Sequence, residues 1–142
     1  MQGLRILGES VSMQTIPFAN LAFDDLCKPF GSQRNDYSYF QSLISRFGVY
    51  IVQEKETGKV LYVGEAHAQD LKERITQNYT ERDTGGTFRD NWCANESQDF
   101  AEFKAALNNW TIKIVSIDTE SKDLIRAIEA VLISALKPQH NK

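Results

Sequence analysis

The residues of this chain whose types and spacing suggest chemistry are two tyrosines, followed downstream by an arginine, a glutamate and an asparagine. The first tyrosine, Tyr50, ends the tripeptide GVY, and the second, Tyr62, begins the tripeptide YVG. Hydrolysis of a phosphodiester bond needs an activated water, a cation that stabilises the phosphoryl oxygens and help for the leaving oxygen. The side chains of this chain offer a candidate for each of these tasks.

A β-hairpin is predicted to position the two tyrosines. Apolar and β-branched residues alternate over residues 49–52 and 60–63, and the turn-forming sequence ETG lies between them. In a short-loop register the tyrosines stand about opposite one another, with both rings on one face. We expect Gly48 and Gly64 to allow close backbone approach beside them. A pair of hairpin core tyrosines is the structural alternative to a functional role.

A C-terminal helix is predicted to position the carboxylate. It spans residues 121–136 and ends before Pro138. Glu129 lies at the edge of its apolar stripe, about 100° from Ile128. The residues of this stripe are Leu124, Ile128, Val131, Leu132 and Ala135. Taken alone, Glu129 is better interpreted as a boundary residue that reaches toward water.

Five elements in a fixed order give the chain a resemblance to a known family. They are GVY at residues 48–50, YVG at residues 62–64, Arg74, Glu129, and Pro138 with Asn141. Together they resemble the GIY-YIG nuclease superfamily over about residues 47–141. The interval between the second tyrosine and the arginine is slightly longer than in typical members.

The resemblance implies a catalytic role for each of these side chains. Tyr50 or Tyr62 would act on water as the general base, or would position it. A phenol titrates near ~10, so it needs a nearby cation, which Arg74 and a metal ion would supply. Arg74 would also bind the scissile phosphate. Glu129 would be the ligand of one Mg²⁺ or Mn²⁺ ion, and Asn141 would hold the phosphate, the water or the glutamate.

Accessory candidates follow the second tripeptide. His67 could relay a proton, although a solvated loop histidine is the simpler interpretation. Arg89 could contact phosphate or be a surface charge. Tyr79 or Asn78 could fill the polar or aromatic position that often follows the arginine in the family. Glu65 stands where some relatives carry a lysine, so that role is not transferred.

Composition places the chain among ordinary soluble globular proteins. It has 142 residues, 42% hydrophobic and 25% charged, which is enough for one domain with a core. We expect a cytoplasmic protein with two reduced cysteines, because no apolar run reaches the length of a membrane span. A net charge of −3 means that any nucleic-acid surface must be a local patch. The candidates are Lys72, Arg74, Arg82 and Arg89, and Lys137, His140 and Lys142 at the tail.

The predicted architecture is α+β, with a small, mainly antiparallel, three-stranded sheet flanked by helices. Residues 47–142 form the nuclease-like module, and residues 1–46 form an N-terminal extension packed on it. In the extension we predict a short strand at residues 4–7 and a helix over residues 36–44. The remaining elements predicted for the module are helices over residues 69–79 and 99–107 and a third strand over residues 110–117.

Two functions follow from these predictions. The first is a divalent-metal-dependent endonuclease that hydrolyses DNA in restriction or defence, in a mobile element or in repair, with RNA left open as a substrate. The second is a catalytically silent GIY-YIG-fold module that binds nucleic acid or another protein, which the negative charge favours. A homodimer would be needed to cut both strands with one site per chain, or a recruiting partner would bring the protein to DNA.

Overall fold

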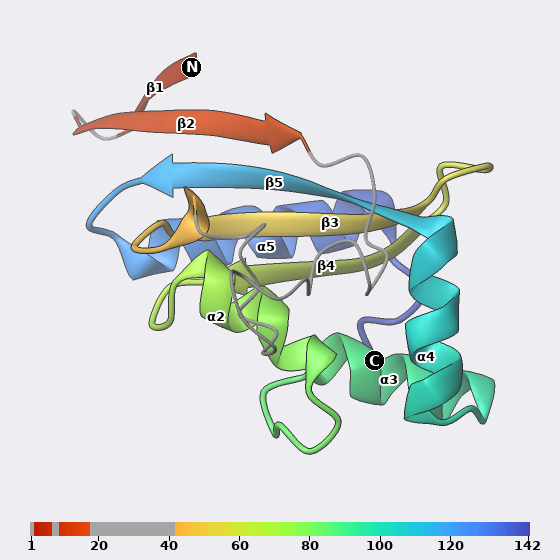
Figure 1. Ribbon diagram of the computed structural model, residues 1–142. Helices are drawn as coiled ribbons and strands as arrows, with labels where there is room; N and C mark the ends of the chain where they lie inside the picture. The colour runs from red at the N-terminus through yellow and green to blue at the C-terminus, as the bar shows by residue number, and fades with distance from the viewer. Residues whose placement is uncertain (1, 7–8, 18–41) are drawn as a thin grey trace.

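The computed structural model describes residues 2–6, 9–17 and 42–142 of the chain as an α+β fold (Figure 1). The strands are β1 (Gln2–Ile6), β2 (Glu9–Pro17), β3 (Gly48–Glu54), β4 (Val60–Ala66) and β5 (Trp110–Asp118). The helices are α2 (Leu71–Thr76), α3 (Thr87–Glu96), α4 (Phe100–Ala106) and α5 (Lys122–Leu136), with 3₁₀ turns η2 (Gln77–Tyr79) and η3 (Leu107–Asn109). The predicted fold class is confirmed, and the predicted helix over residues 36–44 falls mostly outside the described residues.

The sheet is wider than the three strands predicted from the sequence. It has five strands in the order β1-β2-β5-β3-β4, and every neighbouring pair is antiparallel. Strands β3, β4 and β5 are the three strands predicted for the sheet, and β1 lies where a short strand was predicted in the extension. The two additional strands join through β2, whose Met13 pairs with Ile117 of β5. A short strand has no local signal for its partner, so the sequence alone could not assign this pairing.

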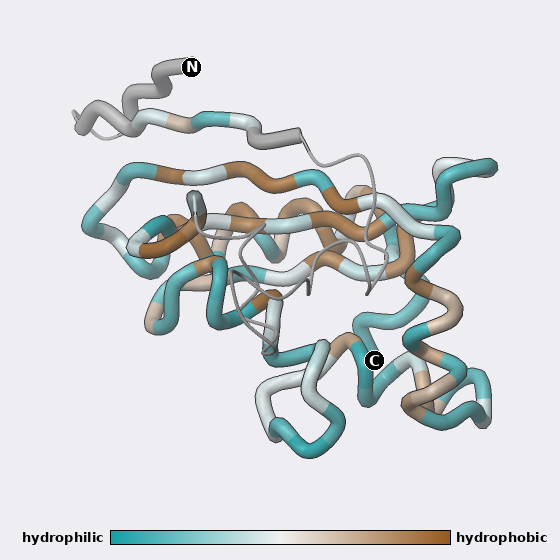
Figure 2. Tube along the Cα trace, viewed as in Figure 1, coloured by the Kyte–Doolittle hydropathy of each residue, from teal (hydrophilic) through white to brown (hydrophobic). Residues whose placement is uncertain are grey.

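Two apolar cores pack against the sheet. The smaller core contains Val49 and Ile117 of the sheet and Ile125 of α5, which lies behind the sheet in Figure 1. The larger core contains aromatic side chains of α3, α4 and β5, and brown apolar segments run along the central strands in Figure 2. The predicted stripe of α5 was wrong at two positions: Val131 is 66% exposed and Ala135 is also exposed. The buried residue of that helix is Ile125.

The helix ends follow local chemistry. Asp99 and Glu102 form a reciprocal capping box at the start of α4, and the Ser121 hydroxyl accepts from the Leu124 amide at the start of α5. Helix α3 was not predicted as an element of its own. Phe88 and Arg89 are its buried residues, and Trp92 packs against the larger core. Within the described ranges, no helix is both long and apolar enough to cross a membrane.

Candidate active site

The two tyrosines lie side by side on adjacent strands, but not in the predicted register. Tyr50 pairs with Gly64 and Val52 pairs with Tyr62, so the two tyrosines are not directly opposite one another. Strand β3 extends two residues further toward the turn than predicted, whereas β4 starts at Val60 as predicted. The rings therefore meet diagonally, with centroids 5.9 Å apart. A Cβ added at Gly64 would lie 2.3 Å from the Tyr50 ring, so glycine is needed for that ring to cross β4. Three expectations from the sequence agree with this arrangement: the two rings share one face, they are in contact, and Gly64 allows close approach.

Burial dominates the acidity of both phenols. Tyr50 is hydrogen-bonded to Asn78 and Tyr62 to Tyr50. Burial raises the pKa of Tyr50 well above its usual value of 10.0, and the neighbouring Tyr62 adds to this effect. The pKa of Tyr62 is raised as well, again mainly by burial. The Arg74 guanidinium lowers both values but does not offset burial, so Arg74 by itself does not make either phenol a base near neutral pH.

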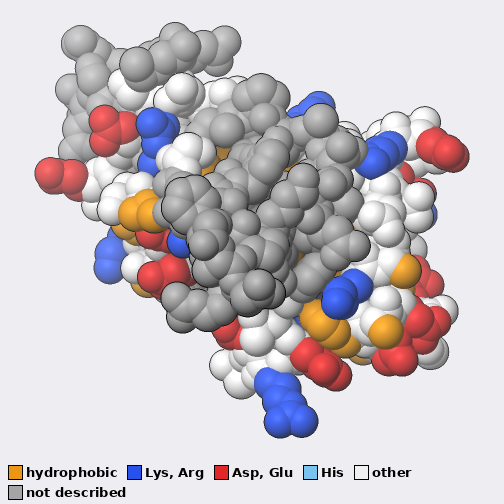
Figure 3. Space-filling model, in the orientation of Figure 1, with side chains coloured by type: hydrophobic (Ala, Val, Ile, Leu, Met, Phe, Trp, Pro, Cys, Tyr) orange, Lys and Arg blue, Asp and Glu red, His pale blue; other side chains and the backbone are white. Residues whose placement is uncertain are grey.

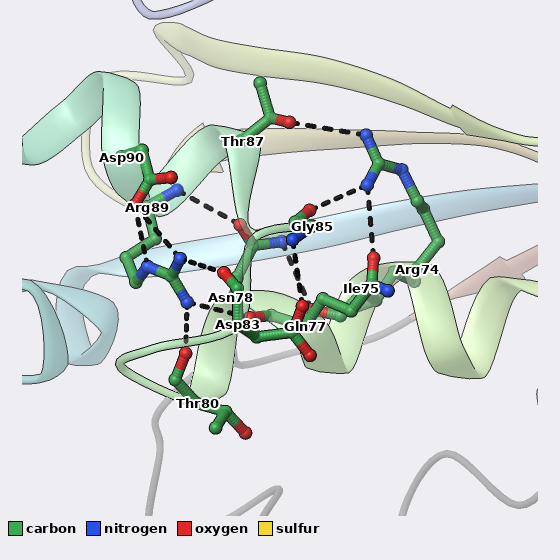
Figure 4. Close-up of polar contacts among 10 residues, drawn as sticks. All are labelled: Arg74, Ile75, Gln77, Asn78, Thr80, Asp83, Gly85, Thr87, Arg89 and Asp90. Atoms are coloured by element: carbon green, nitrogen blue, oxygen red, sulfur yellow. Dashed lines mark hydrogen bonds and ion pairs between the residues drawn. The ribbon is translucent and has the colours of Figure 1, made fainter.

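Arg74 extends from α2 toward the loop that precedes α3 (Figure 4). Its Nη1 donates to the Gly85 carbonyl at 2.7 Å and to the Gln77 side chain at 3.1 Å, and its Nη2 donates to the Thr87 hydroxyl at 3.4 Å. The side chain is half-buried, and its charge acts on both tyrosines. These bonds hold one side of the Arg74 guanidinium, and the N–H donors on its other side can bind an anion.

Glu129 is half-buried on α5, and its carboxylate lies within electrostatic reach of the tyrosines and Arg74. Burial raises the pKa of Glu129, and the charge of Glu65 raises it further, whereas Arg74, Arg126 and His67 lower it. A carboxylate whose pKa is raised by burial and by a neighbouring carboxylate favours an added cation.

His67, an accessory candidate, pairs with Glu65, to which the sequence analysis assigned no role. His67 Nδ1 lies 2.7 Å from Glu65 Oε2, and both side chains are partly exposed. A cleft of about 250 Å³, lined by residues 65–69 and Arg74, opens beside them. The two-residue alternation of β4 could have shown that Glu65 shares the face of Val63. It could not show that His67, beyond the strand end, turns back to contact it.

A single divalent ion fits this donor set. No group of three or more His, Cys, Asp or Glu side chains that could hold a metal occurs in residues 2–6, 9–17 and 42–142. Mg²⁺ keeps several water ligands and is commonly bound by one or two carboxylates together with substrate phosphate. Glu129, with Glu65 as the neighbouring carboxylate, matches that requirement.

Asn141 is bound to the backbone of β4. Its Oδ1 accepts from the Val63 amide at 3.0 Å and its Nδ2 donates to the Val63 carbonyl at 2.7 Å. The tail before it pairs with the same edge, through the Gln139 amide to Val60 and the His140 amide to Leu61. The side chain expected to hold phosphate, water or the glutamate is thus engaged by the residue between Tyr62 and Gly64.

Three other candidates lie inside the protein. Arg89 is only 3% exposed and donates to backbone carbonyls, so it is neither a surface charge nor an exposed phosphate contact (Figure 4). Tyr79 is buried in the larger core. His140 is 1% exposed and lies between β4 and α3, next to Asn95 and Glu96. Arg89 and His140 are therefore removed from the predicted basic patches.

The surface charges in Figure 3 are mixed. On this face, basic and acidic side chains of the described residues are interspersed rather than separated into single-sign regions. A larger hollow, of about 530 Å³, is lined by residues of β2, of β5 and of the segment before β3, among them Gln14, Arg46 and Asp118. Its lining residues include none of the candidate catalytic residues.

The fold and this group of side chains agree with one family. The family model of the GIY-YIG catalytic domain matches residues 46–142. The chain belongs to the GIY-YIG family, a family of nuclease type whose domain implies a nucleic-acid substrate and whose nucleases generally use a divalent metal. A comparison with curated proteins gave no match.

Proposed function

We propose that the protein is a divalent-metal-dependent endonuclease that hydrolyses phosphodiester bonds of DNA. One observation carries the proposal: the charges of Arg74 and Glu129 both act on both tyrosines. An anion binder, a carboxylate and two hydrogen-bonded phenols are thus grouped at one end of β4. Family membership implies the reaction class, and this group provides the side chains for it.

The roles follow from the chemistry of each group. Arg74 binds a non-bridging oxygen of the scissile phosphate with the donors that face away from Gly85. Glu129, with Glu65 beside it, holds one Mg²⁺ or Mn²⁺ ion, which would supply charge neutralisation at the phosphate when bound. Tyr50 and Tyr62 orient the attacking water through their hydroxyls, because burial keeps both phenols protonated. Asn141 supports the site by fixing the backbone of Val63.

We also propose a division of the chain. Residues 47–142 form the nuclease domain, and residues 1–46 form an extension packed on it. The start of the family match at residue 46 and the pairing of β2 with β5 support this division.

Cleavage of supercoiled plasmid tests the function. Wild-type protein should nick or linearise the plasmid with Mg²⁺ or Mn²⁺ and should fail with EDTA. Glu129→Gln and Arg74→Ala should each abolish most of this activity. Glu56→Gln, an exposed glutamate in the hairpin loop, is the matched control and should cleave normally. The ratio of nicked to linear plasmid also reports on the oligomeric state, because direct linearisation requires two active sites to act together.

The second candidate is a catalytically silent module that binds nucleic acid or another protein. The raised pKa values of both tyrosines favour a silent site, and the net charge of −3 favours a protein partner over nucleic acid. Metal-independent binding to DNA without cleavage, unchanged in Glu129→Gln, would establish this alternative and contradict the nuclease.

A further inference from the structure

Arg89 is a buried arginine that the proposed reaction does not use. Its side chain is 4% exposed, while its only ion-pair partner among the described residues, Asp90, is 60% exposed. Burying a guanidinium is costly unless its donors are satisfied. Its Nη1 donates to the carbonyls of Gln77, at 2.9 Å, and Thr80, and its Nη2 donates to the carbonyl of Asp83.

These three carbonyls lie in one segment, residues 77–83, that leads from α2 into the loop before α3 (Figure 4). The same loop continues to Gly85, whose carbonyl binds Arg74. The Gly85 amide donates to the Asp83 side chain at 2.8 Å, and the Gly85 carbonyl accepts from Arg74 at 2.7 Å. Arg89 and Arg74 are therefore joined through Asp83 and Gly85 by a continuous series of hydrogen bonds.

Two adjacent glycines make this arrangement possible. A Cβ added at Gly85 would lie 2.2 Å from Oε1 of Gln77, which also accepts from Arg74. A Cβ added at Gly86 would lie 2.5 Å from Cζ of Arg89. Glycine at these positions therefore leaves room for Gln77, which binds Arg74, and for the guanidinium of Arg89 itself.

We infer that Arg89 is a positioning residue for the active site. It holds the loop of residues 80–86 so that the Gly85 carbonyl fixes the guanidinium of Arg74 at the phosphate position. The inference rests on the proposed function only through the phosphate-binding role given to Arg74. The orientation of Arg74 itself does not depend on whether the protein cleaves DNA.

The expected effect is on turnover rather than on folding or substrate capture. Arg89→Lys keeps the positive charge but cannot donate to three carbonyls in a fixed fork. A misplacement of about 1 Å at a catalytic group costs on the order of 10²-fold in rate. We expect kcat to fall by about 10- to 100-fold with KM changed by less than about threefold. Glu81→Gln, at an exposed residue of the same loop, is the control and should cleave as wild type does.

A double-mutant cycle separates positioning from general structural support. In an Arg74→Lys background, which keeps a cation and measurable activity, Arg89→Lys should cost less than about twofold, because the group it positions is already altered. If Arg89→Lys reduces kcat by the same factor in both backgrounds, Arg89 does not act through Arg74 and the inference is overturned. Gly86→Ala displaces the Arg89 guanidinium without changing that residue, and it should reproduce the cycle if Arg89→Lys fails to fold.

A spectroscopic readout keeps this test independent of cleavage. In ¹⁵N-labelled protein without DNA, the Nε–Hε signal of Arg74 is assigned by its loss in Arg74→Lys. Arg89→Lys and Gly86→Ala should shift or broaden that signal, and Glu81→Gln should not. An unchanged Arg74 signal in folded Arg89→Lys protein would contradict the inference. A shifted signal in a protein that never cleaves DNA would instead uphold the inference and remove the proposed function.

Discussion

The two halves of strand β4 differ in what covers their outer edge. From Val60 to Val63 the edge is covered by the C-terminal tail, through backbone pairs and the side chain of Asn141. From Gly64 onward the strand leads into the cleft of Glu65, His67 and Arg74. An edge strand presents unpaired backbone groups, and this protein pairs one half with its tail and opens the other onto the cleft beside Glu65 and Arg74.

The comparison shows how stability and function are separated along one strand. In the covered half, polar groups are paired and His140 is buried with its pKa lowered, so that it is neutral. In the open half, Glu129 has its pKa raised by burial and by Glu65. Functional sites often keep such unfavourable electrostatics, and the surrounding fold compensates. Substitutions in the two halves should therefore have different consequences.

The largest effect is expected for Glu129→Gln in the open half. Cleavage should fall by about 10³-fold, because a bound metal contributes several kcal/mol of charge stabilisation. Stability should not fall. Since the folded-state pKa of Glu129 is raised above 4.5, its ionised form opposes folding, and this penalty develops as the pH rises through the folded-state value. Urea unfolding at pH 7 should find the variant at least as stable as wild type, and a clear loss of stability would break the comparison.

Gly64→Ala lies at the junction and should lower both properties. The added Cβ would lie 2.3 Å from the Tyr50 ring, and overpacking of this kind costs about 1–3 kcal/mol. Displacement of Tyr50 should also reduce kcat by roughly 10-fold or more. Gly58→Ala is the control: its φ of +73° makes alanine strained, at about 1 kcal/mol, but no atom lies within 4 Å. Thermal melts and cleavage rates should show that Gly58→Ala loses stability alone.

Asn141→Ala probes the covered half. It removes both side-chain bonds to the Val63 backbone and should cost about 2 kcal/mol. Gln139→Ala is the matched control, because Gln139 pairs with β4 through its backbone amide, and it should change stability little. Loss of activity in Asn141→Ala with unchanged urea unfolding would mean that this side chain acts on substrate and not through Val63.

The smallest effect is a pH dependence from His140. Burial lowers its pKa from 6.5, against the opposing effect of Glu96 and with a small contribution from Lys59. The unfolded chain therefore binds a proton that the folded protein does not, and stability is lost as the pH falls below 6.5. His140→Gln removes this titration. Its free energy of unfolding should decline less than that of wild type between pH 7.5 and 5.5, and parallel curves would show that His140 is not the group responsible.

Local patterns in the sequence determined the hairpin, the final helix and the residues placed on them. Alternation with period two placed Tyr50 and Tyr62 on one face, and helical periodicity placed Glu129 at the boundary of α5. These features depend on neighbours a few residues apart, so composition and spacing are enough to predict them. The order of the motifs then indicated the family.

Only the tertiary structure decided which polar residues are buried and what they contact. The register that pairs Tyr50 with Gly64, the junction of β2 with β5, and the 78-residue separation between Asn141 and Val63 all depend on long-range pairing. Arg89 and His140 looked like surface cations in the sequence. Whether a charged group is buried depends on whether distant backbone groups satisfy it, and local sequence does not carry that information.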